Sequence, residues 1–374
     1  MADQIKITGL KNDLQQLVKK IAVDDDSNWM TFLDAQRILC ELTLLKFNNA
    51  IVLPAGINPP TNPVHDNPIA YNVEGISTEE TARFSSLLKA IFTGDSEVQK
   101  KAAKDLLLLT EETPPIWVLF KSDTAIWKLL SPLEHKDSAH LHPDLQEALI
   151  TIVLNISIHD EIKEMLLIPR MTTVLIVKAM KEGTLMTRRN AIASVLMLAE
   201  YDPNKSTLGR FGGVRALIEI IGSQDLLCLK DLAIQALSRL CSLGENRELT
   251  VFDGGIPVIL ERIKSGRHVS ELLPILSMVS GTIVGSISLR ERDDDVVPLM
   301  LRIIKESDLD GDKEACVFVL YNTYTNPFPV FHKAHYKLKE DARNSHGAVA
   351  NLAENGTENA REKAKLLLEQ LELV

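Results

Sequence analysis

Three histidines form the closest approach to a metal site in this sequence. His140 and His142 alternate along the chain, and His135 precedes them by five residues. A structural zinc site holds four ligands, and this cluster has no cysteine or carboxylate that completes such a set. We therefore interpret the three residues as solvated side chains and expect neither a metal nor another cofactor.

The acidic segment from Asp308 to Asp312 resembles a calcium loop in composition only. Glycine stands at its fourth position instead of the sixth, and Val319 occupies the twelfth position, where a bidentate glutamate is needed. The phosphate-binding Gly-x-x-x-x-Gly-Lys motif and the Gly-x-Ser-x-Gly nucleophile motif are absent from the sequence. The sequence thus predicts no catalytic centre of its own.

Basic residues are the remaining charged groups that could act together. Arg188, Arg189, Lys230 and Arg239 come from neighbouring copies of a repeated segment. Packed helices lie about 10 Å apart, so these charges could face a single acidic ligand. An alternative stays open, in which Arg189 pairs with Asp231 across repeats and no free patch forms.

An internal repeat in the sequence predicts the helices that position these residues. The segment Leu185–Gly266 contains one pattern written twice, and the glycine pairs Gly212-Gly213 and Gly254-Gly255 mark the same break 42 residues apart. A fixed period of about 40–47 residues with helical apolar spacing is typical of HEAT or armadillo solenoids. The sequence therefore predicts an all-α binding scaffold.

Apolar residues at helical spacing predict alternating long and short helices. The long helices are expected at a segment opened by a Ser96–Gln99 capping box, and at Asp144–Ser157, Leu185–Glu200, Leu227–Cys241, Ser270–Ser280 and Lys313–Thr325. The shorter ones are expected at Ala125–Leu133, Thr172–Lys181, Val214–Ile221, Ile256–Lys264 and Val296–Lys305. Thr357 is expected to cap a final helix that ends near Leu373.

These patterns divide the chain into three parts. Residues 1–46 predict a helical hairpin, and residues 47–77 read as a proline-rich linker with few periodic apolar positions. Residues 78–374 are expected to form a solenoid of about six repeats that ends in a capping helix, since terminal repeats need a polar outer face.

Composition limits the partners and the compartment. The net charge of −10 argues against general nucleic-acid binding, which needs a basic face. The four cysteines form no Cys-x-x-Cys pair, which favours a reducing compartment. The most apolar run, Leu272–Ser288, contains Pro274 and is short for a membrane span. We expect a cytoplasmic or nuclear protein that binds other proteins.

Several segments carry a family resemblance. Residues 245–266 resemble an armadillo repeat, with a charged short helix, a glycine turn and an apolar helix. Residues 187–205 and 356–373 are similar to the armadillo region of plant U-box proteins, and residues 10–21 resemble the helical segment that precedes their U-box. The resemblance implies a right-handed superhelical armadillo solenoid that binds proteins.

The resemblance is interrupted where the U-box should stand. The family implies about 70 residues there, with a Cys-Pro-Ile entry, an Asp-Pro-Val turn and a Trp-bearing helix. The segment Phe47–Gly75 is too short and has none of these. Two hypotheses follow: an interaction scaffold in a ubiquitin or signalling context, or a ubiquitin ligase with a degenerate or recruited module. Enzymatic activity is left undecided.

The resemblance also implies a binding groove lined by the third helix of each repeat. In armadillo proteins that bind extended peptides, asparagines recur along this groove. The corresponding positions here are Leu108, Asn155, Met197, Arg239 and Asn322. Only two of them are asparagine, which argues against an import-adaptor groove, and Asn155 could equally be an interhelical amide. The candidate partner-binding residues are Asn155, Arg188, Lys230, Arg239 and Asn322.

Overall fold

The structure is a computed structural model that describes residues 76–134, 142–167, 170–224, 226–325, 338–343 and 347–372. Contacts divide the chain into two units, and every described residue belongs to the unit Ala70–Asn326 with Ala334–Val374. The predicted hairpin at residues 1–46 lies outside the described residues, as does the linker at residues 47–77 apart from its last two positions. Those two assignments stay predictions.

The described residues form helices and no strand. Four consecutive groups of three helices make up the middle of this unit. Their first helices are α7 (Asp160–Leu167), α10 (Asp202–Arg210), α13 (Gly244–Phe252) and α16 (Ile283–Arg290). Their second helices are α8 (Arg170–Glu182), α11 (Gly213–Gly222), α14 (Gly255–Lys264) and α17 (Asp293–Glu306). Their third helices are α9 (Leu185–Leu198), α12 (Lys230–Cys241), α15 (Val269–Ser280) and α18 (Asp310–Tyr324).

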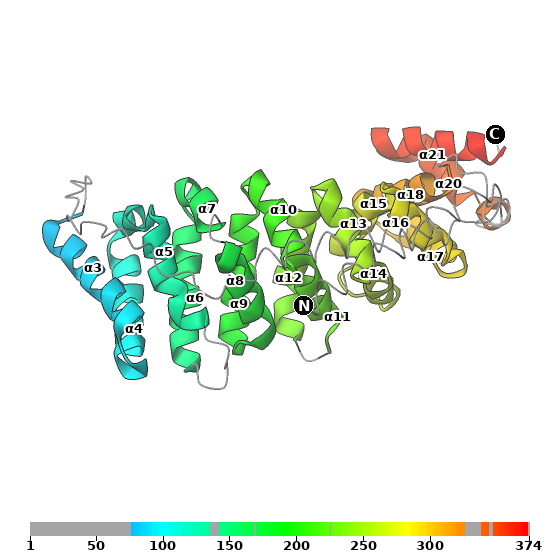
Figure 1. Cartoon of the computed structure of the whole chain (residues 1–374). Helices are drawn as coiled ribbons and strands as arrows, with labels where there is room; N and C mark the ends of the chain where they lie inside the picture. The colour runs from blue at the N-terminus through cyan, green and yellow to red at the C-terminus, as the bar shows by residue number, and fades with distance from the viewer. Residues whose placement is uncertain are drawn as a thin grey trace, which may run out of the picture. The chain divides into compact units, whose positions relative to one another are not determined.

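Shorter groups flank these four. On the N-terminal side lie α3 (Thr78–Thr93), α4 (Ser96–Glu112), the 3-10 helix η1 (Pro114–Phe120), α5 (Asp123–Leu130), the 3-10 helix η2 (Ser131–Glu134) and α6 (Pro143–Ser157). On the C-terminal side lie α20 (Ala348–Asn355) and α21 (Glu358–Gln370). In Figure 1 the described helices follow one another in chain order from α3 to α21. Each group thus contacts mainly the groups before and after it.

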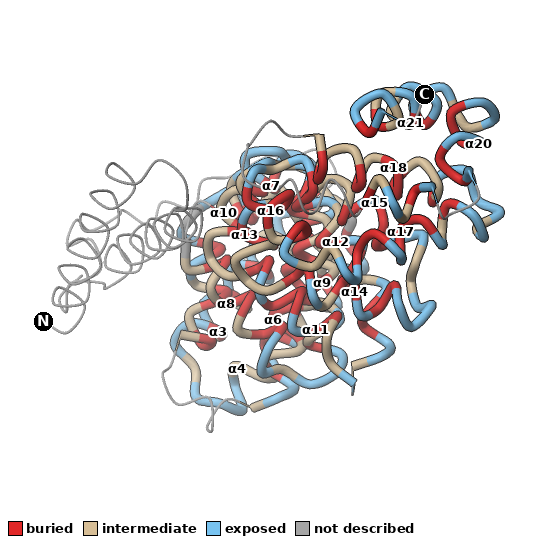
Figure 2. Tube along the Cα trace, turned by 90° about the vertical axis from the view of Figure 1, so that its right-hand side faces the viewer, coloured by how far each residue is buried: buried red, intermediate tan, exposed pale blue. Residues whose placement is uncertain are grey.

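Helices at the same position in each group pack against one another. The third helices form a continuous series that begins with α4 and α6, passes through α9, α12, α15 and α18, and ends with α21. The first helices α7, α10, α13 and α16 form a second series. Figure 2 shows the buried residues on the sides of helices that face their neighbours. Ala191 and Ala233 are fully buried at the same point of α9 and α12, where a small side chain permits close approach.

The glycine breaks are confirmed and have a backbone cause. Gly212 has φ of +91° and Gly254 has φ of +78°. Both residues precede a second helix and adopt the left-handed conformation, which glycine enters without a steric penalty. The same turn between first and second helices is therefore built twice, 42 residues apart.

The predicted N-cap is confirmed for the last helix, α21, and is wrong for α4, near the start of the described residues. Thr357 accepts a hydrogen bond from the Ala360 amide (3.1 Å) and begins α21, as predicted. The predicted capping box at Ser96 is wrong. Asp95 occupies the N-cap of α4 instead, and its carboxylate accepts from the two free amides at positions 97 and 98. An anionic acceptor one residue earlier complements the positive helix end better than a hydroxyl does.

One predicted long helix is divided. The segment Leu227–Cys241 begins with the 3-10 helix η4 (Leu227–Leu229) and continues as α12. No single described helix is long and apolar enough to cross a membrane; α15 and α16 meet that length and composition only as a pair bent by 112°.

Candidate partner-binding surface

The series of third helices presents a row of accessible side chains. Arg239 is exposed on α12 and Leu108 is 48% exposed on α4. Asn155, Met197 and Asn322 are half-buried on α6, α9 and α18. We call these five residues the third-helix surface. Four of them lie on the consecutive members α4, α6, α9 and α12 of the series. The fifth, Asn322, lies on α18, which follows α15.

The two asparagines of this surface connect neighbouring third helices. The Asn155 amide donates to Thr110 Oγ1 of α4 (3.1 Å), and the Asn322 amide donates to Ser280 Oγ of α15 (3.1 Å). Each amide retains further hydrogen-bonding groups, because asparagine has two N–H donors and a carbonyl acceptor. The interhelical role that the sequence left open is therefore present, and contact with a ligand stays a proposal.

Arg188 and Lys230 hold the ends of second helices. Arg188 Nε donates to the Gly183 carbonyl that follows α8 (3.0 Å). Lys230 Nζ donates to the Ser223 carbonyl that follows α11, and the lysine is only 1% exposed. The carbonyls at a helix C-terminus carry partial negative charge and attract cations. The predicted steering patch of Arg188, Lys230 and Arg239 is therefore not assembled, since Lys230 is buried and Arg188 is engaged.

The alternative pairing of Arg189 with Asp231 is also corrected. Asp231 Oδ1 lies 2.8 Å from His268 Nε2, at the residue that precedes α15. Arg189 stays exposed on α9, as does Arg239 on α12. Of the four candidate cations, Arg189 and Arg239 thus remain exposed, on two different third helices.

His142 has a structural place. Its Nδ1 accepts a hydrogen bond from the Asp144 amide (3.3 Å) at the start of α6, and its Nε2 lies 3.2 Å from Lys100 Nζ. His135 and His140 lie outside the described residues. Within the described ranges, no three histidine, cysteine or acidic side chains come together as metal ligands.

A set of recurring bonds, not predicted from the sequence, connects the first helices to their neighbours. Lys163 of α7 and Lys205 of α10 are almost fully buried. Lys163 contacts Glu200, shortly after the end of α9, and Lys205 contacts Ser242, directly after α12. Asn204 and Asn246 make equivalent bonds to main-chain carbonyls. Both pairs are 42 residues apart, the same step as the glycine pairs, and this recurrence was the signal that could have revealed them.

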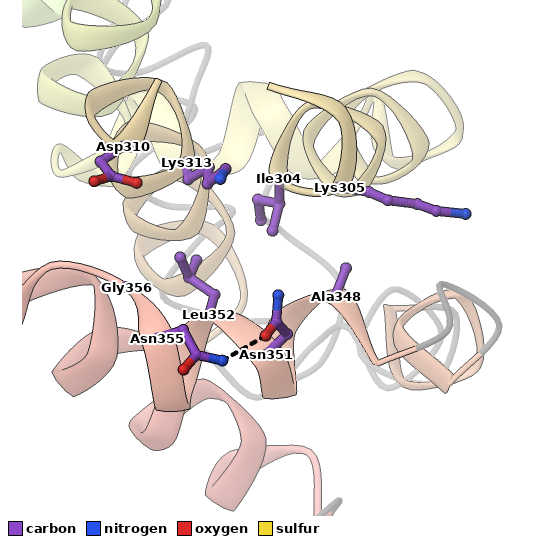
Figure 3. Close-up of a pocket in the computed structure, with 9 residues that line it drawn as sticks. All are labelled: Ile304, Lys305, Asp310, Lys313, Ala348, Asn351, Leu352, Asn355 and Gly356. Carbon is purple, nitrogen blue, oxygen red and sulfur yellow. Dashed lines mark hydrogen bonds between the residues drawn. The ribbon is translucent and has the colours of Figure 1, made fainter. Parts of the chain in front are cut away.

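Two of the hollows in the described part of the chain are lined by no residue of the third-helix surface. The one between α17, α18 and α20 has about 270 Å³. In Figure 3, Ile304, Ala348 and Leu352 face the space between these helices, whereas the Lys305 side chain points away from it. Its lining therefore resembles an imperfectly filled helix junction. The second hollow, of about 490 Å³, lies beside α11 and α14 and is lined by Arg262 and Arg267.

Comparisons with known proteins define the class. No protein-family model matches the chain. A crystal structure of computationally designed armadillo repeat proteins for modular peptide recognition superposes with a TM-score of 0.50, covering 66% of this chain and 99% of that chain at 15% identity. The unit described above is an armadillo-repeat solenoid, which confirms the predicted fold class.

The sequence relatives are plant proteins. U-box domain-containing protein 9 of Arabidopsis thaliana is 32% identical over 302 residues, which cover 80% of this chain and 63% of that protein. Putative U-box domain-containing protein 46 of the same plant is 31% identical over 293 residues, covering 77% and 63%. The chain spans less than two thirds of the length of these relatives. The chain has the armadillo-repeat fold and is similar in sequence to U-box domain-containing proteins of plants.

Proposed function

We propose that this protein is a protein–protein interaction scaffold whose third-helix surface binds a segment of a partner. The observation that carries the proposal is the unbroken series of third helices from α4 to α21, which sets Leu108, Asn155, Met197 and Arg239 on four successive members of the series. A solenoid makes such a surface because each repeat contacts only its neighbours and leaves one side of the series open.

Two further observations support it. The designed armadillo proteins that share the fold are named for modular peptide recognition. The interhelical bonds of Asn155 and Asn322 fix the spacing of the helices that form the surface, so a ligand would meet a preorganised site. The relationship to plant U-box proteins favours a partner from ubiquitin-dependent regulation or signalling.

Site-specific photo-crosslinking tests the proposal. A photoreactive amino acid would replace Met197 or Arg239, and a matched control would carry it at Arg302, which is exposed on the second helix α17. In plant cell extract we expect an adduct at positions 197 and 239 and none at 302, with the same adduct formed when the identified partner is purified. Equal crosslinking at all three positions would refute a binding role for the third-helix surface.

Ubiquitin ligase activity is the second candidate, favoured by the U-box names of the relatives. The sequence between Phe47 and Gly75 has no U-box motif, so a conjugating enzyme would have to bind elsewhere or through a recruited protein. An in vitro reaction of the full chain with activating enzyme, a panel of conjugating enzymes and ubiquitin tests this. Ubiquitin chains that depend on the added protein would establish a ligase.

A further inference from the structure

Two buried cations meet at the C-terminal end of α11. Arg262 of α14 donates through Nη2 to the carbonyls of Gly222 (2.9 Å) and Ser223 (3.0 Å). Lys230, at the start of α12, donates to the same Ser223 carbonyl. Arg262 is 6% exposed and Lys230 is 1% exposed. Side chains from two neighbouring repeats therefore converge on one helix end.

A third cation, Arg267, lies at the same place. Arg267 lines the same hollow as Arg262 and is exposed to solvent. Within the described part of the chain, none of these three cations makes an ion pair, and the two nearby acidic residues Asp231 and Asp295 pair with His268 and Lys264. Among the described residues that line the hollow, Glu261 is the one acidic residue, and it too is exposed.

The helix end compensates only part of this charge. A helix C-terminus is equivalent to roughly half a negative elementary charge, whereas three positive charges gather here. The pKa of Lys230 is accordingly lowered, first by its burial and then by the nearby charges of Arg262 and Arg267. Burying like charges together is unfavourable unless an anion joins them.

The hollow has room for such an anion. It has about 490 Å³, which is within the range of small-ligand pockets, and it opens to solvent beside Gln224 and Arg267. Pro257 and Val258 form an apolar wall on α14. Leu227, 58% exposed in η4, lies three residues before Lys230. The hollow thus presents both cationic and apolar groups. An acidic peptide that also carries apolar side chains could contact both kinds of group.

We propose that the hollow between the end of α11 and helix α14 binds an acidic segment of a protein partner, with an anionic side chain held by Arg262 and Arg267. Lys230 contributes positive potential from beneath the surface. This inference rests on the proposed scaffold function and adds a second contact outside the third-helix surface. The anion is a carboxylate or a phosphorylated side chain, which share the charge and oxygen acceptors that arginine recognises.

Fluorescence anisotropy of the full chain with two labelled peptides tests the proposal and separates the two anions. One probe is a hexaglutamate peptide with flanking leucines, and the other replaces two glutamates with phosphoserine. We expect saturable binding of at least one probe at about 50 mM salt, weakened at higher salt by screening. Arg267→Glu should weaken that binding about tenfold or more, the effect expected for reversing a direct charge contact.

Matched variants keep the test interpretable. Gln224→Glu places a negative charge in the same hollow at an exposed residue and should also weaken binding, whereas Arg239→Glu on the third-helix surface should leave it within about twofold. The side chains of Gln224 and Arg239 are exposed and donate no hydrogen bond to any described helix C-terminus. Circular dichroism of both variants should therefore show unchanged folding. The inference is overturned if neither probe saturates below about 1 mM, or if Arg267→Glu and Gln224→Glu bind like the unchanged protein. Loss with Arg239→Glu alone would assign the acidic segment to the third-helix surface, leaving the scaffold function intact.

Discussion

Asn204 and Asn246, 42 residues apart, make the same pair of hydrogen bonds in successive repeats. Asn204 Nδ2 donates to the carbonyls of Lys163 (2.8 Å) and Leu198 (3.1 Å). Asn246 Nδ2 donates to the carbonyls of Lys205 (2.9 Å) and Leu240 (3.0 Å). Each amide therefore joins its own first helix to the preceding first helix and to the third helix between them.

Replacing either asparagine by alanine should destabilise the solenoid. Each substitution removes two hydrogen bonds between helices, and the loss of one such bond costs about 0.5–1.5 kcal/mol. Asn359→Ala is the matched control, because Asn359 is exposed and makes one long bond of 3.3 Å to Glu314. Urea unfolding followed by circular dichroism measures the difference. Equal midpoints for Asn246→Ala and Asn359→Ala would contradict this account.

Gly254 and Gly244 provide a clean comparison of backbone effects. A Cβ added at either position would meet no atom within 4 Å, yet only Gly254 has a positive φ, of +78°. Gly254→Ala should therefore cost about 1–2 kcal/mol, because alanine is strained in the left-handed region. Gly244→Ala should be neutral or stabilise by about 0.5 kcal/mol, since Gly244 begins helix α13. Thermal unfolding of the two variants checks the difference in sign.

The repeat architecture could be predicted because its causes lie within the sequence. Gly212 and Gly254 recur at the step of 42 residues, and the turn they form depends on local backbone freedom alone. Buried alanines such as Ala191 and Ala233 recur at the same step for a local reason, the close approach of neighbouring helices. The presence of α4 was also predicted, although its cap was assigned one residue too late.

The site was harder to predict because its partners come from other elements. Lys230 looks like a surface cation in the sequence, and only the folded chain places the Ser223 carbonyl within reach of its ammonium group. Asp231 likewise finds His268, a residue of the next repeat, instead of the Arg189 expected. Arg262 and Arg267 were not singled out, since one arginine in a helix and another in the following loop form a candidate site only when they lie beside the end of α11.

The ionisation of Lys163 should make the solenoid less stable at alkaline pH. Its ammonium lies 2.6 Å from Asp160 and 2.5 Å from Glu200. Burial opposes the charge, but the hydrogen bonds and charges of Asp160 and Glu200 outweigh it, and the pKa is raised above its ordinary value of 10.5. A raised folded pKa stabilises the protein below pH 10.5 and loses that contribution as the pH rises through the folded pKa.

Lys163→Met keeps the apolar stem and removes the charge. It should lower the free energy of unfolding by about 1 kcal/mol at neutral pH, because the carboxylate partners are partly exposed and screened. The difference from the unchanged protein should shrink above pH 10.5. Lys205→Met is the control with a single carboxylate partner, because Lys205 pairs with Asp202 but the equivalent of Glu200 in that repeat is the neutral Ser242. A difference that persists unchanged at high pH would rule out titration of Lys163 as its cause.

Cysteine reactivity should report on the packing of the third helices. Cys228 is exposed in η4, whereas Cys241 of α12 and Cys316 of α18 are buried. Burial raises the pKa of the Cys241 thiol to about 11 and that of Cys316 still further, so neither forms the reactive thiolate near pH 8. In a Cys40→Ser variant treated with iodoacetamide at that pH, peptide mapping should show alkylation of Cys228 alone, and of all three thiols in urea. Rapid native modification of Cys241 would mean that α12 separates from α13, where Thr250 Oγ1 lies 3.3 Å from the Cys241 sulfur. The thiols therefore measure repeat-by-repeat opening independently of any ligand.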